Sequence, residues 1–428
     1  MSLAQSLLED CINPEFPLGL QEPVSLPPAP DPSSGLPSVD RRLQYRLITN
    51  YFAASQQHFP LFPTFSRATI EHLLSTDPDN PILHAICVVS AHLARARGLS
   101  IEGLSGSVEV FAAHAKSKFA AESFTTNVNL NVIKVALLIA IYDSFCEPHT
   151  TRPTSVEEAI RLAYQYGLHR VDSSPNFAFK DDDRDECRCL WWSICGLDGF
   201  AGWAYSRAAL VNAGEEPQSV LPSVLSTAFP LRHGSKFPSS LAGTCRDAIS
   251  IRGIRGHGKH GYVLSLAFFR STFLALQSLN VTDQDVSLQV LSLEDCLTSV
   301  RLAVLEEIRD STQHPPRAAL SVHMANGILA TKLSQHDNAD VVSQWDKCFA
   351  AASSILDIVR DLPVNVLLTL NPQSFGPIWF SGVCVRLHLQ ITQSQVKRQY
   401  LLSRINLVYA VLGRVSEVWE IGKSFYGN

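Results

Sequence analysis

From Val39 onward, hydrophobic residues recur every three to four positions, which is the spacing of a helix that buries one face. The purest apolar run, residues 135–141, predicts a helix in the core. The sequence contains no pair of alternating segments joined by a hairpin turn. The pattern therefore predicts an all-α fold, with one large multi-helix domain over residues 39–428. Further helices of ordinary length are predicted for residues 262–279, 288–308, 318–333, 341–362 and 378–391.

Residues 1–38 differ from the rest of the chain. Eight prolines fall between Pro14 and Pro37, mixed with Ser, Gly and Asp and with few apolar residues. Such a composition buries too little apolar surface to offset the entropy of ordering the chain. We therefore expect a disordered, proline-rich segment over residues 1–38. Before these prolines, Leu3, Leu7 and Leu8 have the spacing of one or two helical turns.

Two segments near the middle of the chain carry the strongest helical signals. In residues 155–170 (SVEEAIRLAYQYGLHR), Ser155 and Glu158 form a predicted capping box, and Gly167 supplies the left-handed residue that ends a helix. The second helix begins with five acidic residues within 181–186, where the positive end of the helix dipole favours them. We expect these two helices to pack against each other.

The second helix carries one acidic residue on its apolar face. Asp198 shares that face with Leu190, Trp191, Ile194 and Leu197. A carboxylate that is removed from water is strongly destabilising unless it is paired and hydrogen-bonded. We therefore expect Asp198 to be buried and bonded to an arginine, because the guanidinium donates two hydrogen bonds to one carboxylate. The nearby arginines are Arg161, Arg170 and Arg207.

This pair of segments resembles the middle homology region of fungal zinc-cluster transcription factors. In that family an A-I-R-L-A helix ends in G-L-H-R, and an acidic linker leads to R-R-L-W-W, then L-D-R and a G-R-P turn. Residues 159–163, 167–170, 190–192 and 197–198 match this pattern. The chain departs from it at Gly199, where the family has Arg, and around Arg207, where the flanking Gly and Pro are lost.

Flanking segments extend the resemblance over roughly residue 40 to the C-terminus. Tyr51 and Phe52, with residues 58–60, are similar to the Y-F and H-P-x-F-P entry of the family. Residues 83–91 are similar to its L-L-x-A-I-C-A-L-G-A helix. A final helix, predicted over residues 412–423 with Trp419, is similar to its closing W-P-x-A segment.

The resemblance implies a nuclear regulator of transcription that controls a metabolic or secondary-metabolite pathway. Its helical domain would contact a DNA-binding transcription factor, the transcription machinery or a small-molecule effector, and a homo- or heterodimer is a further option. The residues of the family motif are implied to be structural, and we expect no catalytic, cofactor-binding, metal-binding or DNA-binding residue. The motif residues are His169, Arg170, Trp191, Trp192, Asp198 and Arg207.

The family's DNA reader is a binuclear zinc cluster that needs C-x2-C-x6-C followed by a second cysteine triplet. None of the ten cysteines in this sequence forms a C-x2-C pair. The nearest cluster, Cys187, Cys189 and Cys195, lies on the predicted tryptophan-rich helix, where positions i and i+2 point to different faces. We expect a regulator without its own zinc cluster. An N-terminally truncated form of a sequence-specific DNA-binding factor remains the alternative.

Composition agrees with a globular chain that has no general attraction to nucleic acid. The sequence has 35 basic and 40 acidic residues, for a net charge of −5. No apolar run approaches the roughly 18 residues of a membrane helix, and no signal peptide begins the sequence. We therefore expect no membrane attachment, and cysteines that remain reduced thiols.

Phosphate-binding strings in the sequence lack the context that they need. Residues 253–259 fit the P-loop string G-x4-G-K, but His260 follows where Ser or Thr would hold magnesium. Gly256, Gly258 and Gly261 spell G-x-G-x-x-G without a strand-helix-strand unit around them. A flexible basic connection is the favoured interpretation.

The strongest enzyme alternative is an all-helical isoprenoid synthase. Asp181, Asp182 and Asp185 spell D-D-x-x-D, which binds the magnesium ions of such enzymes. These aspartates, however, are predicted to begin a helix, and no N-D-x-x-S-x-x-x-E motif completes a metal site. The sequence therefore favours a non-enzymatic protein without a cofactor.

Overall fold

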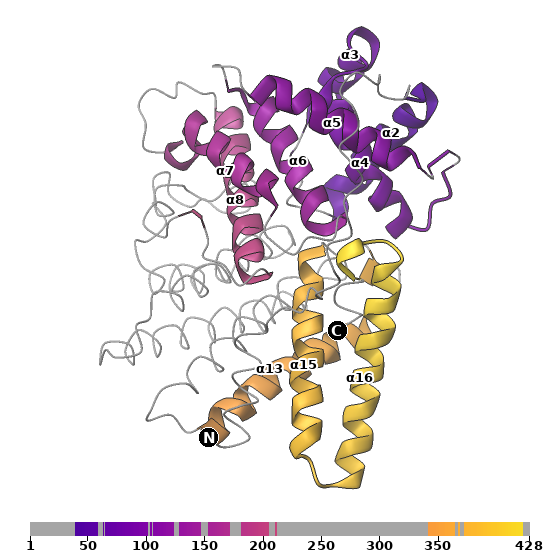
Figure 1. The fold of residues 1–428 in the computed structure, drawn as a ribbon, viewed down its shortest axis with the longest axis vertical. Coiled ribbons are helices and arrows are strands. Elements are labelled where there is room, and N and C mark those ends of the chain that lie inside the picture. The colour runs from indigo at the N-terminus through magenta and orange to yellow at the C-terminus, as the bar shows by residue number, and fades with distance from the viewer. Residues whose placement is uncertain are drawn as a thin grey trace, which may run out of the picture. The chain divides into compact units, whose positions relative to one another are not determined.

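The computed structural model is all-α in the residues that it describes, with no strand among them (Figure 1). The predicted fold class is confirmed. These residues fall into two compact units, the first built from residues up to Leu168 together with those from Val415 on, and the second from residues 169–414. The described residues are 39–58, 63, 65–101, 103–104, 106–123, 128–146, 153–171, 181–204, 210–211, 341–363, 367–368 and 372–422.

Several predictions concern residues outside this set. The proline-rich segment, the glycine-rich strings at 253–261 and the predicted helices at 262–279, 288–308 and 318–333 all lie outside the described residues. The assignment of residues 39–428 to one domain stays a prediction.

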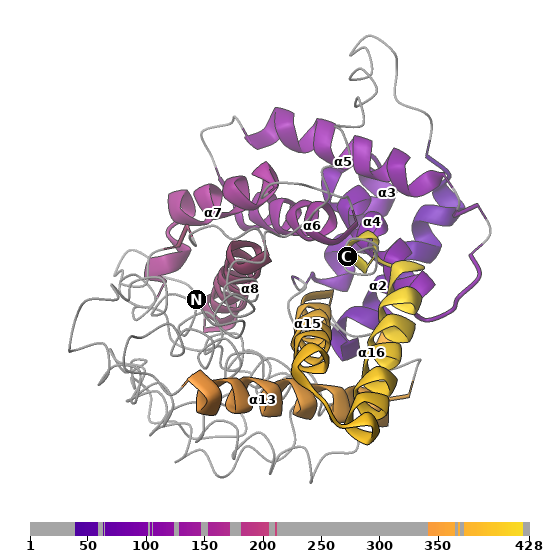
Figure 2. The ribbon, with the colours of Figure 1, turned by 60° about the horizontal axis from the view of Figure 1, so that its bottom comes forward.

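The first unit is a set of six helices arranged around α4 (Figure 2). Helix α4 packs against α2, α3, α5 and α6, while α6 also contacts α5 and α7. The helices of this unit are α2 (Arg41–His58), α3 (Arg67–Thr76), α4 (Pro81–Ala96), α5 (Ser107–Ser123), α6 (Leu130–Cys146) and α7 (Thr154–Tyr166).

Helix α4 is central because nearly every side of it is apolar. Asn80 starts the helix by accepting a hydrogen bond from the backbone N–H of Ile82, and Pro81 occupies a first-turn position where its missing N–H costs nothing. One of its polar residues, Ser90, bonds to partners on α2. The side-chain amide of Asn50 donates to the carbonyl of Ser90 at 3.1 Å, and the Ser90 hydroxyl donates to the carbonyl of Leu47 at 2.6 Å.

Helix α6 confirms the predicted core helix. Residues 132–146 of this helix are all buried. Two charged side chains are accommodated by contacts inside the unit. Asp143 pairs with Lys116 of α5 at 2.8 Å, and the ammonium of Lys134 lies 5.0 Å from the centre of the Phe65 ring.

Helix α7 ends as predicted but begins differently. Gly167 is left-handed, with a φ of 90°, and its N–H bonds to the carbonyls of Ala163 and Tyr164. The capping box is wrong, because Pro153 occupies the cap position without a side-chain bond and the helix already runs from Thr154. Glu158 therefore pairs with Arg161 on the helix surface, at 2.6 Å.

The second unit contains α8 (Asp181–Ala204), α13 (Val341–Asp361), α15 (Phe375–Ile391) and α16 (Gln395–Ser416). The predictions at 341–362 and 378–391 are confirmed by α13 and α15. The predicted final helix is wrong in its bounds, since α16 already begins at Gln395 and ends at Ser416, before Trp419.

Helices α15 and α16 form a helical hairpin that is visible in both ribbon views (Figures 1 and 2). Gly382 permits their close approach, because a Cβ at this position would lie 2.8 Å from Cγ1 of Val408. Helix α13 packs on α15, where the thiols of Cys348 and Cys384 lie 3.6 Å apart and Trp345 Nε1 donates to His388 Nδ1 at 3.0 Å.

Candidate functional site

The family-motif residue Asp198 is fully buried on α8, as predicted. Both of its carboxylate oxygens accept the backbone N–H of Leu210, each at 3.1 Å, and Oδ2 also accepts the N–H of Val211 at 3.0 Å. These donors replace hydrogen bonds that the carboxylate loses when it leaves water. Asp198 therefore fixes the chain at 210–211 back onto α8.

Of the three arginines considered as partners of Asp198, Arg161 is excluded. The guanidinium of Arg161 binds its own helix, through two bonds to Glu158 at 2.7 and 2.6 Å and one to Gln165 at 2.9 Å. The hydrogen bond with Glu158 raises the pKa of Arg161 above its ordinary value. Arg207 lies outside the described residues, and Arg170 is exposed. A bond from either of these two to Asp198 stays a prediction.

The other described motif residues lie in the short turn η1 and within α8. His169 and Arg170 belong to η1 (Leu168–Arg170), the short turn that follows Gly167. The His169 ring is buried and lies 6.1 Å from the Trp191 ring, tilted by 50°. Trp191 and Trp192 are both buried, although adjacent positions on a helix diverge by about 100°. His169, Trp191 and Trp192 are thus buried together with Asp198, whereas Arg170 is exposed.

The acidic residues 181–186 lie at the start of α8, where the positive end of the helix dipole was expected to favour them. The helix begins at Asp181, so the D-D-x-x-D string occupies its first turns rather than its interior. Within the described part of the chain, no group of three or more His, Cys, Asp or Glu side chains could hold a metal ion. Of the three clustered cysteines, Cys187 and Cys195 are buried and Cys189 is partly exposed.

Trp419 makes the longest-range contact of the first unit. Its ring is buried and stacks on His92 of α4, with centroids 5.3 Å apart and an angle of 19°. His92 Nδ1 lies 3.1 Å from the carbonyl of Val418. Burial lowers the pKa of His92 to about 4, so the ring is neutral near pH 7 and its Nδ1–H donates to this carbonyl. The C-terminal residues are therefore part of the first unit.

A second buried histidine lies on the same helix. His84 is fully buried and stacks on His114 of α5, with centroids 4.9 Å apart. Burial lowers its pKa to about 4, the charges of His114, Arg41 and Lys118 act in the same direction, and Asp79 opposes them. Sequence reasoning missed both histidines, because a histidine in an apolar helix gives no local signal of its partner.

Comparison with known families gives a match, which covers α4, α6, α7 and α8. Residues 48–214 match the family model of the fungal specific transcription factor domain. The match begins within α2 and extends past the bend that binds Asp198. Residues 48–214 thus form a fungal specific transcription factor domain, a domain of transcription regulators, and the predicted resemblance is confirmed over these residues. Searches of curated proteins and of solved structures gave no match.

No helix in the described part of the chain is both long enough and apolar enough to cross a membrane.

Proposed function

We propose that this chain is a nuclear, non-catalytic regulator of transcription, whose helical domain over residues 39–428 acts through protein or effector contacts. The observation that carries the proposal is the fungal specific transcription factor domain at 48–214, in a sequence whose cysteines have no zinc-cluster spacing. Recruitment to promoters is then the task of a DNA-binding partner. Its targets are genes of a metabolic or secondary-metabolite pathway.

Two features support a non-catalytic role. The acidic residue of the family motif, Asp198, is buried and bound to backbone amides, so its contacts are those of a structural residue. The histidines His84 and His92 are buried in the core of the first unit and neutral near pH 7, where they have no access to a substrate.

The proposal is tested with a reporter gene. The full chain is fused to an unrelated sequence-specific DNA-binding domain, and reporter transcription is compared with that of the DNA-binding domain alone. We expect a several-fold change with the intact chain, a loss of this change with Trp419→Ala, and retention with Tyr45→Ala, which alters an exposed side chain on α2. An intact fusion that is abundant and nuclear but leaves transcription unchanged contradicts the proposal.

The 5′ end of the transcript distinguishes the proposed regulator from the alternative, a truncated DNA-binding factor. A reading frame that continues upstream into C-x2-C-x6-C and a second cysteine triplet would replace recruitment by direct DNA reading. The contribution of the helical domain to the reporter assay would be unchanged.

A further inference from the structure

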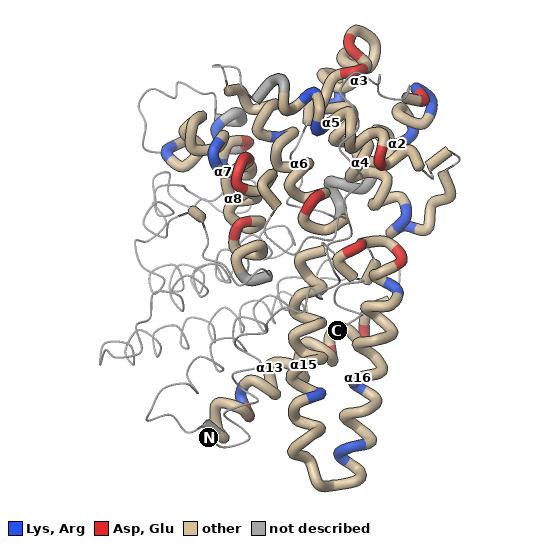
Figure 3. Tube along the Cα trace, viewed as in Figure 1, with Lys and Arg blue, Asp and Glu red and all other residues tan. Residues whose placement is uncertain are grey.

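The α15–α16 hairpin is basic throughout, in a chain whose net charge is −5. From Phe375 to Ser416 the sequence has no Asp or Glu, and the charged positions along the traces of these two helices are blue in Figure 3. The basic residues are Arg386, Lys397, Arg398, Arg404 and Arg414.

Exposed apolar residues flank the turn between the two helices. Ile391 ends α15, and after the turn at 392–394, Val396 and Tyr400 lie one helical turn apart on α16. Val396 is 77% exposed and Tyr400 50% exposed, whereas the apolar residues of α4 and α6 are buried. Ile391, Val396, Tyr400 and the exposed Lys397 are here called the hairpin tip.

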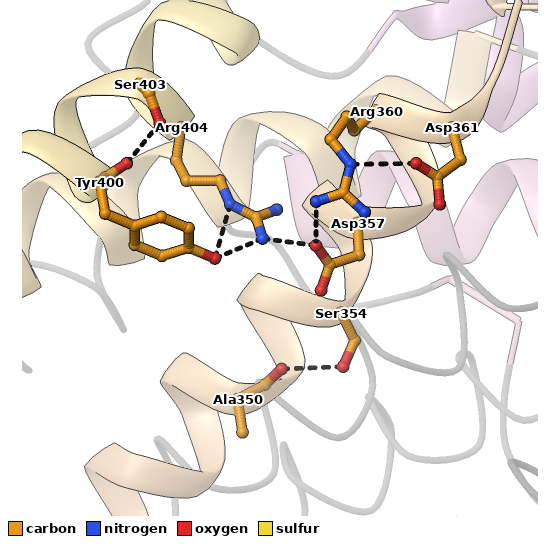
Figure 4. A network of polar contacts seen from close by, with 8 residues as sticks. All are labelled: Ala350, Ser354, Asp357, Arg360, Asp361, Tyr400, Ser403 and Arg404. Carbon is orange, nitrogen blue, oxygen red and sulfur yellow. Dashed lines mark hydrogen bonds and ion pairs between the residues drawn. The ribbon is translucent and has the colours of Figure 1, made fainter. Parts of the chain in front are cut away.

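Tyr400 is held in place although half of it faces water (Figure 4). The buried guanidinium of Arg404 donates from Nε to the Tyr400 hydroxyl at 2.9 Å and lies 5.0 Å from the centre of its ring. Arg404 is itself paired with Asp357 of α13. An aromatic ring that is fixed before binding loses little entropy when a ligand covers it.

The turn beside Tyr400 is also braced. Arg398 donates from Nη1 to the carbonyls of Leu389 and Thr392, both at 3.1 Å, so it satisfies acceptors at the C-terminal end of α15. The hairpin tip is therefore a rigid surface that combines exposed apolar groups with positive charge. Its chemical complement is an acidic segment with regularly spaced apolar residues.

The chain itself contains such a segment. Residues 1–38 include Glu9, Asp10, Glu15, Glu22 and Asp31 but no Lys or Arg. The apolar residues Leu3, Leu7 and Leu8 have helical spacing and directly precede the first two acidic residues. We propose that residues 3–20 of this chain bind the hairpin tip, with the leucines on Val396 and Tyr400 and the carboxylates near Lys397.

The intervening residues make this contact favourable without high intrinsic affinity. Residues 21–38 span up to about 60 Å when extended. A tether that reaches its binding site keeps its ligand at an effective concentration in the millimolar range. A weak complementary contact is therefore sufficient to keep the hairpin tip covered in the isolated protein.

Photo-crosslinking in the full chain tests the contact. The photoreactive amino acid p-benzoylphenylalanine replaces Val396, and mass spectrometry maps the crosslinked residues. In the matched control the same amino acid replaces Val342, a valine of α13 that is 69% exposed. We expect crosslinks from position 396 to residues 3–20, several-fold above those from position 342. Mixing isotope-labelled with unlabelled protein distinguishes crosslinks within one chain from crosslinks between chains.

Charge reversal tests the recognition itself. Lys397→Glu should reduce the crosslink several-fold, and adding Glu9→Lys and Asp10→Lys to this variant should restore it. The crosslink should also weaken near 1 M salt, where the Debye length is about 3 Å. Crosslinks only between chains, only to other parts of the chain, or unaffected by both charge changes would overturn the proposal. Protection of position 396 by duplex DNA or RNA instead of the acidic segment would also overturn it.

Discussion

Apolar side chains have opposite environments in α4 and α6 of the first unit and at the hairpin tip of the second. In α4 and α6 of the first unit they are buried on nearly every side of the helix, and even the histidines between them are neutral. At the hairpin tip of the second unit they face water beside positive charge. Helices α4 and α6 thus form a packed core, whereas the hairpin tip leaves apolar side chains in water, as the contact proposed for it requires.

The largest expected effect concerns the scaffold. Trp419→Ala removes a buried ring that stacks on His92, so it should lower the free energy of unfolding by about 3–5 kcal/mol. Denaturant unfolding measures the change through the midpoint. If the variant unfolds at the same midpoint as the parent protein, the C-terminal residues do not belong to the first unit.

Asp198→Ala should have the next largest effect. It leaves the buried N–H of Val211 and the N–H of Leu210 without their acceptor, at a cost of roughly 1–3 kcal/mol, and about 3 kcal/mol or more if an arginine is also left unpaired. Asp198→Asn keeps one acceptor oxygen, so its midpoint in a denaturant titration should lie between those of Asp198→Ala and the parent protein. Equal midpoints for all three proteins would show that the bend at 210–211 is held by other contacts.

The buried histidines predict that stability falls in mild acid. Because the folded pKa of His92 is about 4, the unfolded state, near 6.5, takes up the proton first. The contribution of the neutral histidine to the free energy of unfolding is fully present above about pH 6.5. It is lost as pH falls toward 4, by about 1.4 kcal/mol per pH unit for each such histidine. His92→Asn, which keeps a side-chain N–H donor, should reduce this slope between pH 6.5 and 4. An identical slope in the variant would place His92 in contact with solvent.

Substitution at the hairpin tip should change the free energy of unfolding least. Val396→Ala alters a side chain that is already in water, so the free energy of unfolding should change by no more than about 0.5 kcal/mol. A loss comparable with that of Trp419→Ala would remove the contrast between the two units, because Val396 would then be a core residue.

The sequence predicted elements whose signals are local. Gly167 ends α7 because only a residue without Cβ adopts its left-handed conformation easily, and the hydrophobic spacing at 341–362 and 378–391 gave α13 and α15. The capping box failed because Pro153, with its fixed φ, already sets the helix start. The start of α16 was missed because exposed apolar residues such as Val396 and Tyr400 blur its periodicity.

Contacts between residues that are distant in the sequence were harder to predict. The burial of Asp198 follows from its place on an apolar face, but its donors at Leu210 and Val211 lie in a bend twelve and thirteen residues away. The His92–Val418 contact joins residues 326 positions apart, and no local pattern encodes such a pairing. The burial of Asp198 was thus predictable, whereas its backbone donors required the three-dimensional structure.

The most direct test of the central claim is a binding selection with the purified full chain on a library of random duplex DNA near physiological salt. Phosphate contacts supply most of the affinity for DNA and base contacts supply the specificity, and this sequence has a net charge of −5 and no zinc-cluster cysteines. A regulator that is recruited by a partner should enrich no sequence by itself, but should be retained on promoter DNA when that partner is added. An enriched sequence with a salt-sensitive footprint of the chain alone would contradict the account.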